Sequence, residues 1–132
     1  MKNYIYDIET YKNLFCVVFN SQGEDTVFEI SARKNDYEEL RDFYNSRNIK
    51  YAIGFNNVKF DAQVMHFLMV NYGEFRMLRG SQLVEKIYDF AQKVIQKSID
   101  KEFPPYAEWH FDVKQIDLFL INHYDNKNKM TS

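Results

Sequence analysis

Hydrophobic and polar positions in the first thirty residues predict three β-strands joined by short turns. Residues 3–8 (NYIYDI) alternate and are rich in β-forming residues, so the first strand is expected to end near Asp7–Glu9. Residues 14–19 (LFCVVF) form a continuous apolar run, which predicts a strand buried in the sheet. A glycine-centred turn at 21–25 then leads to a third strand at 26–30. Because the connections are short, we expect an antiparallel three-stranded meander.

The middle of the chain shows helical spacing on both sides of a short strand. A helix is predicted over about 36–46, where Asn35 or Asp36 can serve as the N-cap. Residues 50–55 (KYAIGF) predict a short strand, and a second helix is expected over about 58–71. In each helix the apolar residues fall on one face, which indicates that both helices pack against other elements.

A third helical pattern and a final strand complete the prediction. The apolar stripe over 81–98 is typical of an amphipathic helix, and Ser81 is its predicted cap. After a proline-rich break (FPPY), a strand is predicted at 109–113 (WHFDV), followed by a short helical run around 115–123. The order βββαβααβα predicts one α/β domain (1–132) with a mixed sheet flanked by helices.

The composition is that of a folded protein with many aromatic side chains. The chain has 12 Phe, 10 Tyr and 1 Trp, which either fill the core or include exposed rings that stack on bases, as in single-strand binders. Its net charge of −2, from 17 basic and 19 acidic residues, argues against a protein that adheres to duplexes by charge alone. It does not exclude an enzyme that meets nucleic acid through bound cations.

Cysteine usage and hydropathy indicate the compartment. The single cysteine, Cys16, lies in an apolar run and is expected to pack as a small hydrophobic residue. It cannot form an intramolecular disulfide, which fits a reducing cytoplasm. No apolar run approaches the ~20 residues that span a bilayer, and the N-terminal segment has the pattern of a strand rather than of a signal peptide. We therefore expect a cytoplasmic protein without a membrane partner.

The motif YDIET at 6–10 has the clearest chemistry. Residues two apart in a strand point to the same face, so Asp7 and Glu9 are expected to project together while Ile8 points to the core. Two neighbouring carboxylates repel each other unless a cation compensates them, and Mg²⁺ prefers oxygen ligands. The pair therefore indicates a metal site, although the same spacing is also common at solvent-exposed strand ends.

A second motif, GFNNVKFD at 54–61, follows a predicted strand and opens a predicted helix. Gly54 is expected to permit a sharp turn out of the strand, and Asn56 supplies an amide that can bond to a phosphate or a sugar. Asp61 is expected near the first turn of the helix, where its carboxylate can face back over the sheet. The alternative is that Asn56 and Asn57 cap the helix and that Asp61 is a solvated acid.

Together, the two motifs resemble those of the DEDD-type 3′–5′ exonucleases, a family that includes the proofreading domains of DNA polymerases. The first family motif, D-x-E on the first strand of an RNase H-like sheet, is similar to Asp7 and Glu9. The second, G-x-N-x-x-x-F-D, is matched at four positions: Gly54, Asn56, Phe60 and Asp61. The resemblance covers about residues 1–70 and implies an RNase H-like mixed sheet, with parallel strands beside the meander.

The resemblance implies metal-dependent hydrolysis of phosphodiester bonds. Asp7, Glu9 and Asp61 would be the catalytic residues and would coordinate two divalent ions, Mg²⁺ or Mn²⁺, roughly 3.5–4 Å apart at the scissile phosphate. One ion would activate the attacking water, and the other would stabilise the departing 3′ oxygen. The product would be a nucleoside 5′-monophosphate.

The resemblance also implies how the substrate binds. Thr10 would lie against the terminal nucleotide, Asn56 would bond to the substrate, and Phe55 or Phe60 would wedge the terminal bases. The substrate would be the 3′ end of a single-stranded nucleic acid, with DNA favoured over RNA. The partner would be the rest of a polymerase or replication complex in a bacterial or phage-infected cell, where the domain would proofread.

The family has a fourth acid, in a third motif of the form Y-x-x-x-D or H-x-x-x-x-D on a last helix, and the motif is not found here. The nearest matches end in Asn128 rather than in an aspartate. One interpretation is a truncated exonuclease domain of a phage-type DNA polymerase that lacks its final helix. The other is a short relative that uses Asp112, Asp117 or Asp125 instead, or that binds single-stranded nucleic acid or a protein without cutting.

Overall fold

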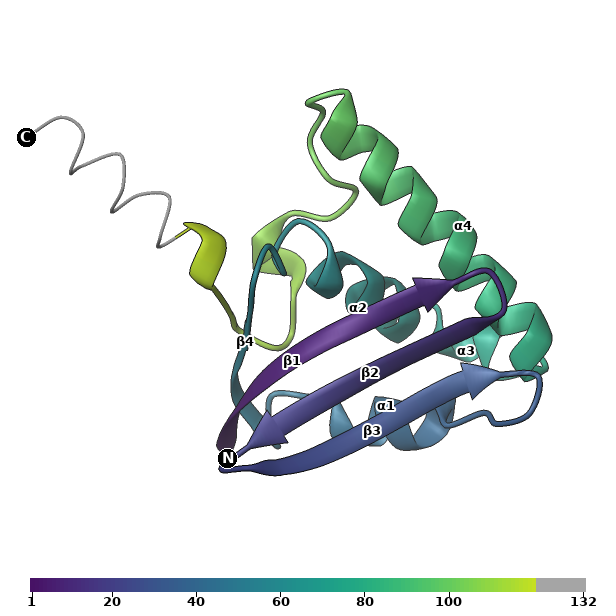
Figure 1. Ribbon diagram of the computed structural model, residues 1–132, viewed down its shortest axis with the longest axis horizontal. Helices are drawn as coiled ribbons and strands as arrows, with labels where there is room; N and C mark the ends of the chain where they lie inside the picture. Colours follow the sequence, from purple (N-terminus) through teal and green to yellow (C-terminus); the bar gives the residue numbers. More distant parts are fainter. Residues whose placement is uncertain (121–132) are drawn as a thin grey trace, which may run out of the picture.

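One five-stranded sheet organises residues 1–120, the part of the chain that the computed structural model describes (Figure 1). The elements in chain order are β1 (Lys2–Tyr11), β2 (Leu14–Ser21), β3 (Glu24–Ser31), α1 (Tyr37–Phe43), β4 (Ile49–Gly54), α2 (Asp61–Val70), α3 (Tyr72–Phe75), α4 (Gly80–Ile99), the 3₁₀ helix η1 (Glu108–His110) and β5 (Gln115–Asp117). The strand order is β3-β2-β1-β4-β5. The pairs β1–β2 and β2–β3 are antiparallel, whereas β1–β4 and β4–β5 are parallel. The predicted fold class, a three-stranded meander extended by parallel strands, is confirmed.

The core lies between the sheet and its helices, on one face of the meander. Tyr6 and Ile8 of β1 are buried, whereas Asp7 and Glu9, which alternate with them, are exposed. Figure 1 shows α1 behind β2 and β3, and α2 next to β1. Phe19 of β2 is fully buried there and stacks on Tyr6, with ring centroids 5.5 Å apart. Part of the large aromatic content therefore fills the core.

The last part of the described chain differs from the sequence prediction. The residues predicted as a strand, 109–113, instead contain the end of η1, and β5 follows at Gln115–Asp117. Trp109 is 83% exposed, and of this stretch only Val113 is buried in the core. Gln115, by contrast, pairs with Ala52 of β4, and its side-chain amide is hydrogen-bonded to two buried tyrosines. The helical run expected from 115 is thus a strand at its start.

Two helices begin at other residues than predicted. α2 begins at Asp61 rather than near 58, with Phe60 in the N-cap position. α4 begins at Gly80, one residue before the predicted cap Ser81. The cap is Arg79, whose backbone N–H donates to a glutamine side chain in the first turn at 2.9 Å. Both helices therefore start without the side-chain cap that their sequences indicate.

The contact between α4 and β3 depends on a glycine. A Cβ atom at Gly80 would lie 2.1 Å from the carbonyl oxygen of Ser31, the last residue of β3. No other residue leaves room for this approach without a backbone shift, because a carbonyl oxygen cannot rotate away as a flexible side chain can. Gly80 thus sets how closely the long helix packs on the sheet.

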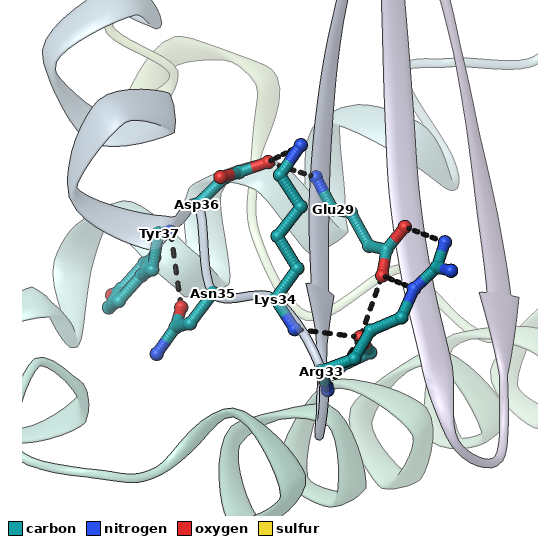
Figure 2. Close-up of polar contacts among 7 residues, drawn as sticks. Glu29, Arg33, Lys34, Asn35, Asp36 and Tyr37 are labelled. Atoms are coloured by element: carbon teal, nitrogen blue, oxygen red, sulfur yellow. Dashed lines mark hydrogen bonds and ion pairs between the residues drawn. The ribbon is translucent and has the colours of Figure 1, made fainter.

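A polar network fixes the connection from β3 to α1 (Figure 2). The Arg33 guanidinium bonds to both carboxylate oxygens of Glu29, at 2.8 and 2.9 Å, and Ser31 Oγ donates to the same carboxylate at 2.7 Å. These hydrogen bonds, above all those of Arg33, lower the pKa of Glu29 to about 2. Asp36 occupies the predicted N-cap position of α1, but its carboxylate accepts the backbone N–H of Glu29 at 2.9 Å instead of capping the helix.

Candidate functional site

The carboxylate of Asp61 lies against β1 at a point where β4 no longer pairs with it. β1 pairs with β4 only up to Ile5. Farther along β1, the backbone N–H of Ile8 donates to Oδ2 of Asp61 at 3.1 Å in a buried hydrogen bond. Because Ile8 stands between Asp7 and Glu9, this bond places the Asp61 carboxylate beside the peptide that links the two other acids. The two sequence motifs therefore meet in space.

A second buried acid, Asp117 at the end of β5, holds the connection from β4 to α2. Its carboxylate accepts the backbone N–H groups of Asn56 at 2.8 Å and Val58 at 3.2 Å. The N–H of Phe119 donates to it at 3.0 Å. Asn56 has a φ of 62°, a left-handed conformation that asparagine adopts more readily than most residues. Asp117 thereby fixes the turn that leads to Asp61.

Gly54 has a different role from the one expected. Its φ is not positive, so the chain does not use it to turn. A Cβ atom there would lie 3.0 Å from both Cβ and Cγ of Asn57, so Gly54 makes room for that fully buried side chain. Asn57 does not cap α2; its Nδ2 donates to Gln115 Oε1 at 2.8 Å, and the Tyr6 hydroxyl donates to the same oxygen at 2.7 Å.

Gln115 is the residue of this region that the sequence did not single out. Its Nε2 donates to the Tyr44 hydroxyl at 2.9 Å, while its Oε1 accepts the bonds from Tyr6 and Asn57. One amide thus links β5, β1, the residue after α1 and the loop before α2. The neighbours of Gln115 in the sequence do not indicate this role, because its three hydrogen-bond partners are distant in sequence.

Burial raises the pKa of Asp61 to about 7. Removal from water is the main cause, because it disfavours the charged carboxylate. Repulsion from Asp7 and, to a smaller extent, from Asp117 acts in the same direction, while the hydrogen bond from Ile8 opposes it. The folded chain therefore holds this acid in a place where a negative charge is unfavourable unless something positive compensates it.

Asp7 and Glu9 occupy the exposed face of β1. Glu9 stands opposite Cys16 of β2 and accepts the Tyr11 hydroxyl at 3.4 Å. Thr10 is half-buried and alternates toward the other face of the strand. Its contact with a terminal nucleotide therefore stays a prediction that rests on the family resemblance.

The carboxylates suit a divalent cation in their chemistry. Asp7, Glu9 and Asp61 offer oxygen ligands, which Mg²⁺ and Mn²⁺ prefer. Among residues 1–120, no lysine or arginine forms an ion pair with any of them. Over the same residues, no three His, Cys, Asp or Glu side chains are placed so as to hold an ion together. The described residues thus supply oxygen ligands of the kind that Mg²⁺ and Mn²⁺ prefer, but no three of them are grouped around one position.

The other predicted substrate contacts lie near the turn before α2. Asn56 is exposed, and Phe60 is partly buried and packs against the core. Phe55 is 62% exposed and meets the Phe119 ring edge to face, with centroids 5.3 Å apart. Phe55 therefore has exposed ring surface on which a base could stack, whereas Phe60 mainly packs against the core.

The three alternatives for a fourth acid differ in position. Asp112 accepts the backbone N–H of Ser46 at 3.1 Å, before β4 begins, whereas Asp61 follows the end of β4. The length of β4, roughly 17–20 Å, separates the two, so Asp112 does not belong to this site. Asp117 is close enough to affect Asp61, but its oxygens already accept three N–H groups. Asp125 lies outside the described residues.

Comparison of the chain with protein-family models, curated proteins and solved structures finds no match. Assignment to the DEDD-type exonucleases is therefore a prediction that depends on the motifs and on the placement of their residues. Within residues 1–120, no helix is both long and apolar enough to cross a membrane.

Proposed function

We propose that this chain is the metal-binding region of a 3′–5′ exonuclease that hydrolyses phosphodiester bonds in nucleic acid. The observation that supports the proposal is the hydrogen bond from the N–H of Ile8 to Asp61. It joins an acid at the start of α2 to a strand that presents Asp7 and Glu9 on one face. The closeness of acids from two distant motifs is hard to explain by folding alone, since Asp7 adds repulsion to the buried Asp61.

Asp7, Glu9 and Asp61 would hold the cations in this proposal. Bound Mg²⁺ or Mn²⁺ supplies the positive charge that attracts a phosphate and the acidity that makes hydroxide from water at neutral pH. The raised pKa of Asp61 fits this role, because a nearby cation favours the charged form that burial disfavours. Asn56 would contribute its side-chain amide as a donor to the substrate, from a turn that Asp117 keeps in place.

The substrate in this proposal is the 3′ end of a single strand, with DNA favoured over RNA, and the product is a nucleoside 5′-monophosphate. A proofreading role would make the rest of a polymerase or replication complex the partner. We place the protein in the cytoplasm of a bacterial or phage-infected cell, which fits its single, half-buried Cys16.

A second candidate is an exonuclease-like module that binds single-stranded nucleic acid or a protein partner without cutting it. The observation that favours it is that, among residues 1–120, no three acidic, cysteine or histidine side chains form a closed ligand group. Such a module would keep the affinity for a strand but would lack its dependence on Mg²⁺ or Mn²⁺.

The test is release of nucleotides from 3′-labelled single-stranded DNA and RNA, with Mn²⁺, with Mg²⁺ and with EDTA. Asp7→Asn should abolish metal-dependent release, because it removes one charged ligand while keeping the size of the side chain. Asp112→Asn is the matched control and should leave release unchanged, since that acid contacts Ser46 at the far end of β4. Absence of both metal binding and release would refute the enzyme, and metal-independent binding of DNA would favour the module.

A further inference from the structure

A groove runs along the C-terminal half of α4, beside the turn that leads to Asp61. It consists of two adjoining hollows of about 340 and 360 Å³, which share Lys59, Val94 and Ser98 in their walls. At one end it reaches Asn56, and at the other it reaches Phe103 in the segment after α4. Figure 1 shows this segment folding back from the end of α4 toward α2. Each hollow has the volume of a small-ligand site.

The groove combines apolar walls with free cations. Ile99 is 67% exposed and Phe103 is 92% exposed, so both offer apolar surface that the described fold does not cover. Lys59 and Lys101 border the groove, and neither forms an ion pair within residues 1–120. Glu102, the acid in the lining, pairs with Lys97 at 3.4 Å. Apolar surface beside the two unpaired lysines suits a ligand with rings and negative charges, which is the chemistry of a nucleic-acid strand.

Lys101 holds a position where glycine is the usual residue. Its φ is 59°, and it follows the end of α4 in a hydrogen-bonded turn. In this turn the N–H of Lys101 donates to Ser98 O at 3.2 Å, and the N–H of Glu102 donates to Lys97 O at 2.8 Å. A lysine in the left-handed conformation destabilises the fold relative to glycine. The chain therefore has a lysine at the edge of the groove, although glycine would suit the backbone conformation better.

We propose that this groove binds the nucleotides next to the 3′ end of single-stranded DNA, with the end itself directed toward Asp61. The inference rests on the proposed function and adds the path by which the strand approaches the acids. Phe103 and Ile99 would contact the bases, and Lys59 and Lys101 would pair with phosphates. Asn56, which lines the groove, connects it to the turn before Asp61.

The test is fluorescence anisotropy with short labelled oligothymidylate, at low salt and in EDTA, using the full chain. Phe103→Ala should weaken binding roughly 5-fold to 100-fold, which is the range for loss of one stacked base. Lys101→Gly should weaken binding several-fold and yet raise Tm by about 1–4 °C, because glycine relieves the backbone while the charge is lost. A purely structural lysine would not separate affinity from stability in this way.

Matched variants away from the groove complete the test. Trp109→Ala removes another strongly exposed aromatic residue, and Lys50→Gln removes an exposed lysine that lies 6.0 Å from the Tyr51 ring. Both should bind oligothymidylate as the unchanged protein does. Equal weakening by groove and control variants, or no effect of Phe103→Ala and Lys101→Gly, would each overturn the proposal.

The proposed groove and the proposed exonuclease activity can be refuted independently of each other. Loss of affinity in the groove variants, without metal-dependent release of nucleotides, would support the groove and refute the exonuclease. Nucleotide release whose KM is unchanged by Phe103→Ala and Lys101→Gly would support the exonuclease and refute the groove.

Discussion

Replacing Asp61 by asparagine should make the metal-free protein more stable at neutral pH. Asparagine has nearly the same volume and keeps an oxygen that can accept the N–H of Ile8, but it has no charge. In the unchanged protein, burial and the neighbouring Asp7 both oppose the charged carboxylate. The substitution therefore removes an unfavourable charge without removing the hydrogen bond.

The size of the effect follows from the pKa of Asp61 in the folded and unfolded states. It is about 7 in the folded protein, against an ordinary value of 3.8. Between pH 3.8 and about pH 7, the carboxyl of Asp61 keeps its proton in the folded protein but loses it in the unfolded chain. The free energy of unfolding therefore falls as the pH rises through this window. A tenfold change in proton affinity is worth ~1.4 kcal/mol, which gives about 4 kcal/mol as the upper bound at alkaline pH.

Urea unfolding in EDTA, followed by circular dichroism from about pH 4 to about pH 8, measures this contribution. Asp61→Asn and the unchanged protein should have nearly equal free energies of unfolding at the acidic end. At the alkaline end the variant should be more stable by about 2–4 kcal/mol. Asp112→Asn, at an exposed acid, should show no such divergence. A variant that is less stable at every pH, or a difference that does not change with pH, would refute the reasoning.

Two further substitutions test the parts of the fold that place Asp61. Asp117→Ala should lower the free energy of unfolding by about 2–4 kcal/mol, because it leaves backbone N–H groups before α2 without an acceptor. Asp117→Asn keeps an acceptor oxygen and should cost less; equal losses in urea unfolding would contradict this account. Gly80→Ala should cost about 1–3 kcal/mol, because the new Cβ meets the carbonyl oxygen of Ser31. Gly73→Ala, where nothing lies within 4 Å of the new atom, is its control, and equal stability of the two variants would argue against a tight α4–β3 contact.

The meander and the orientation of Asp7 and Glu9 were predictable because they depend on local alternation. Side chains two apart in a strand share a face wherever the strand lies, so the exposed acids and the buried Tyr6 and Ile8 follow from the sequence. α4 was predictable for a similar reason, since its apolar stripe repeats over many turns. In these elements the local pattern and the tertiary structure agree.

The end of the sheet was not predictable in the same way. The stretch at 109–113 has the composition of a strand, yet the chain pairs Gln115–Asp117 with β4 instead. That choice depends on partners far away in sequence, namely the hydroxyls of Tyr6 and Tyr44 that bond to Gln115. Gly54 was misread for the same reason, because the close approach of a buried asparagine leaves no mark on the neighbouring residues. Short strands are decided by such distant contacts more than by propensity.

Burial makes the charged form of Asp61 unfavourable, even though the helix dipole favours an acid at the start of α2. The fold requires an acceptor for the N–H of Ile8, and asparagine would provide one without a charge. An aspartate here has a raised pKa, stands near Asp7, and has no basic partner within residues 1–120. A divalent cation would reverse each of these disadvantages, because it favours the charged carboxylate and turns the closeness of two acids into joint coordination. Departures from the most stable choice of residue are expected where a site serves function, and we infer that position 61 is one of them.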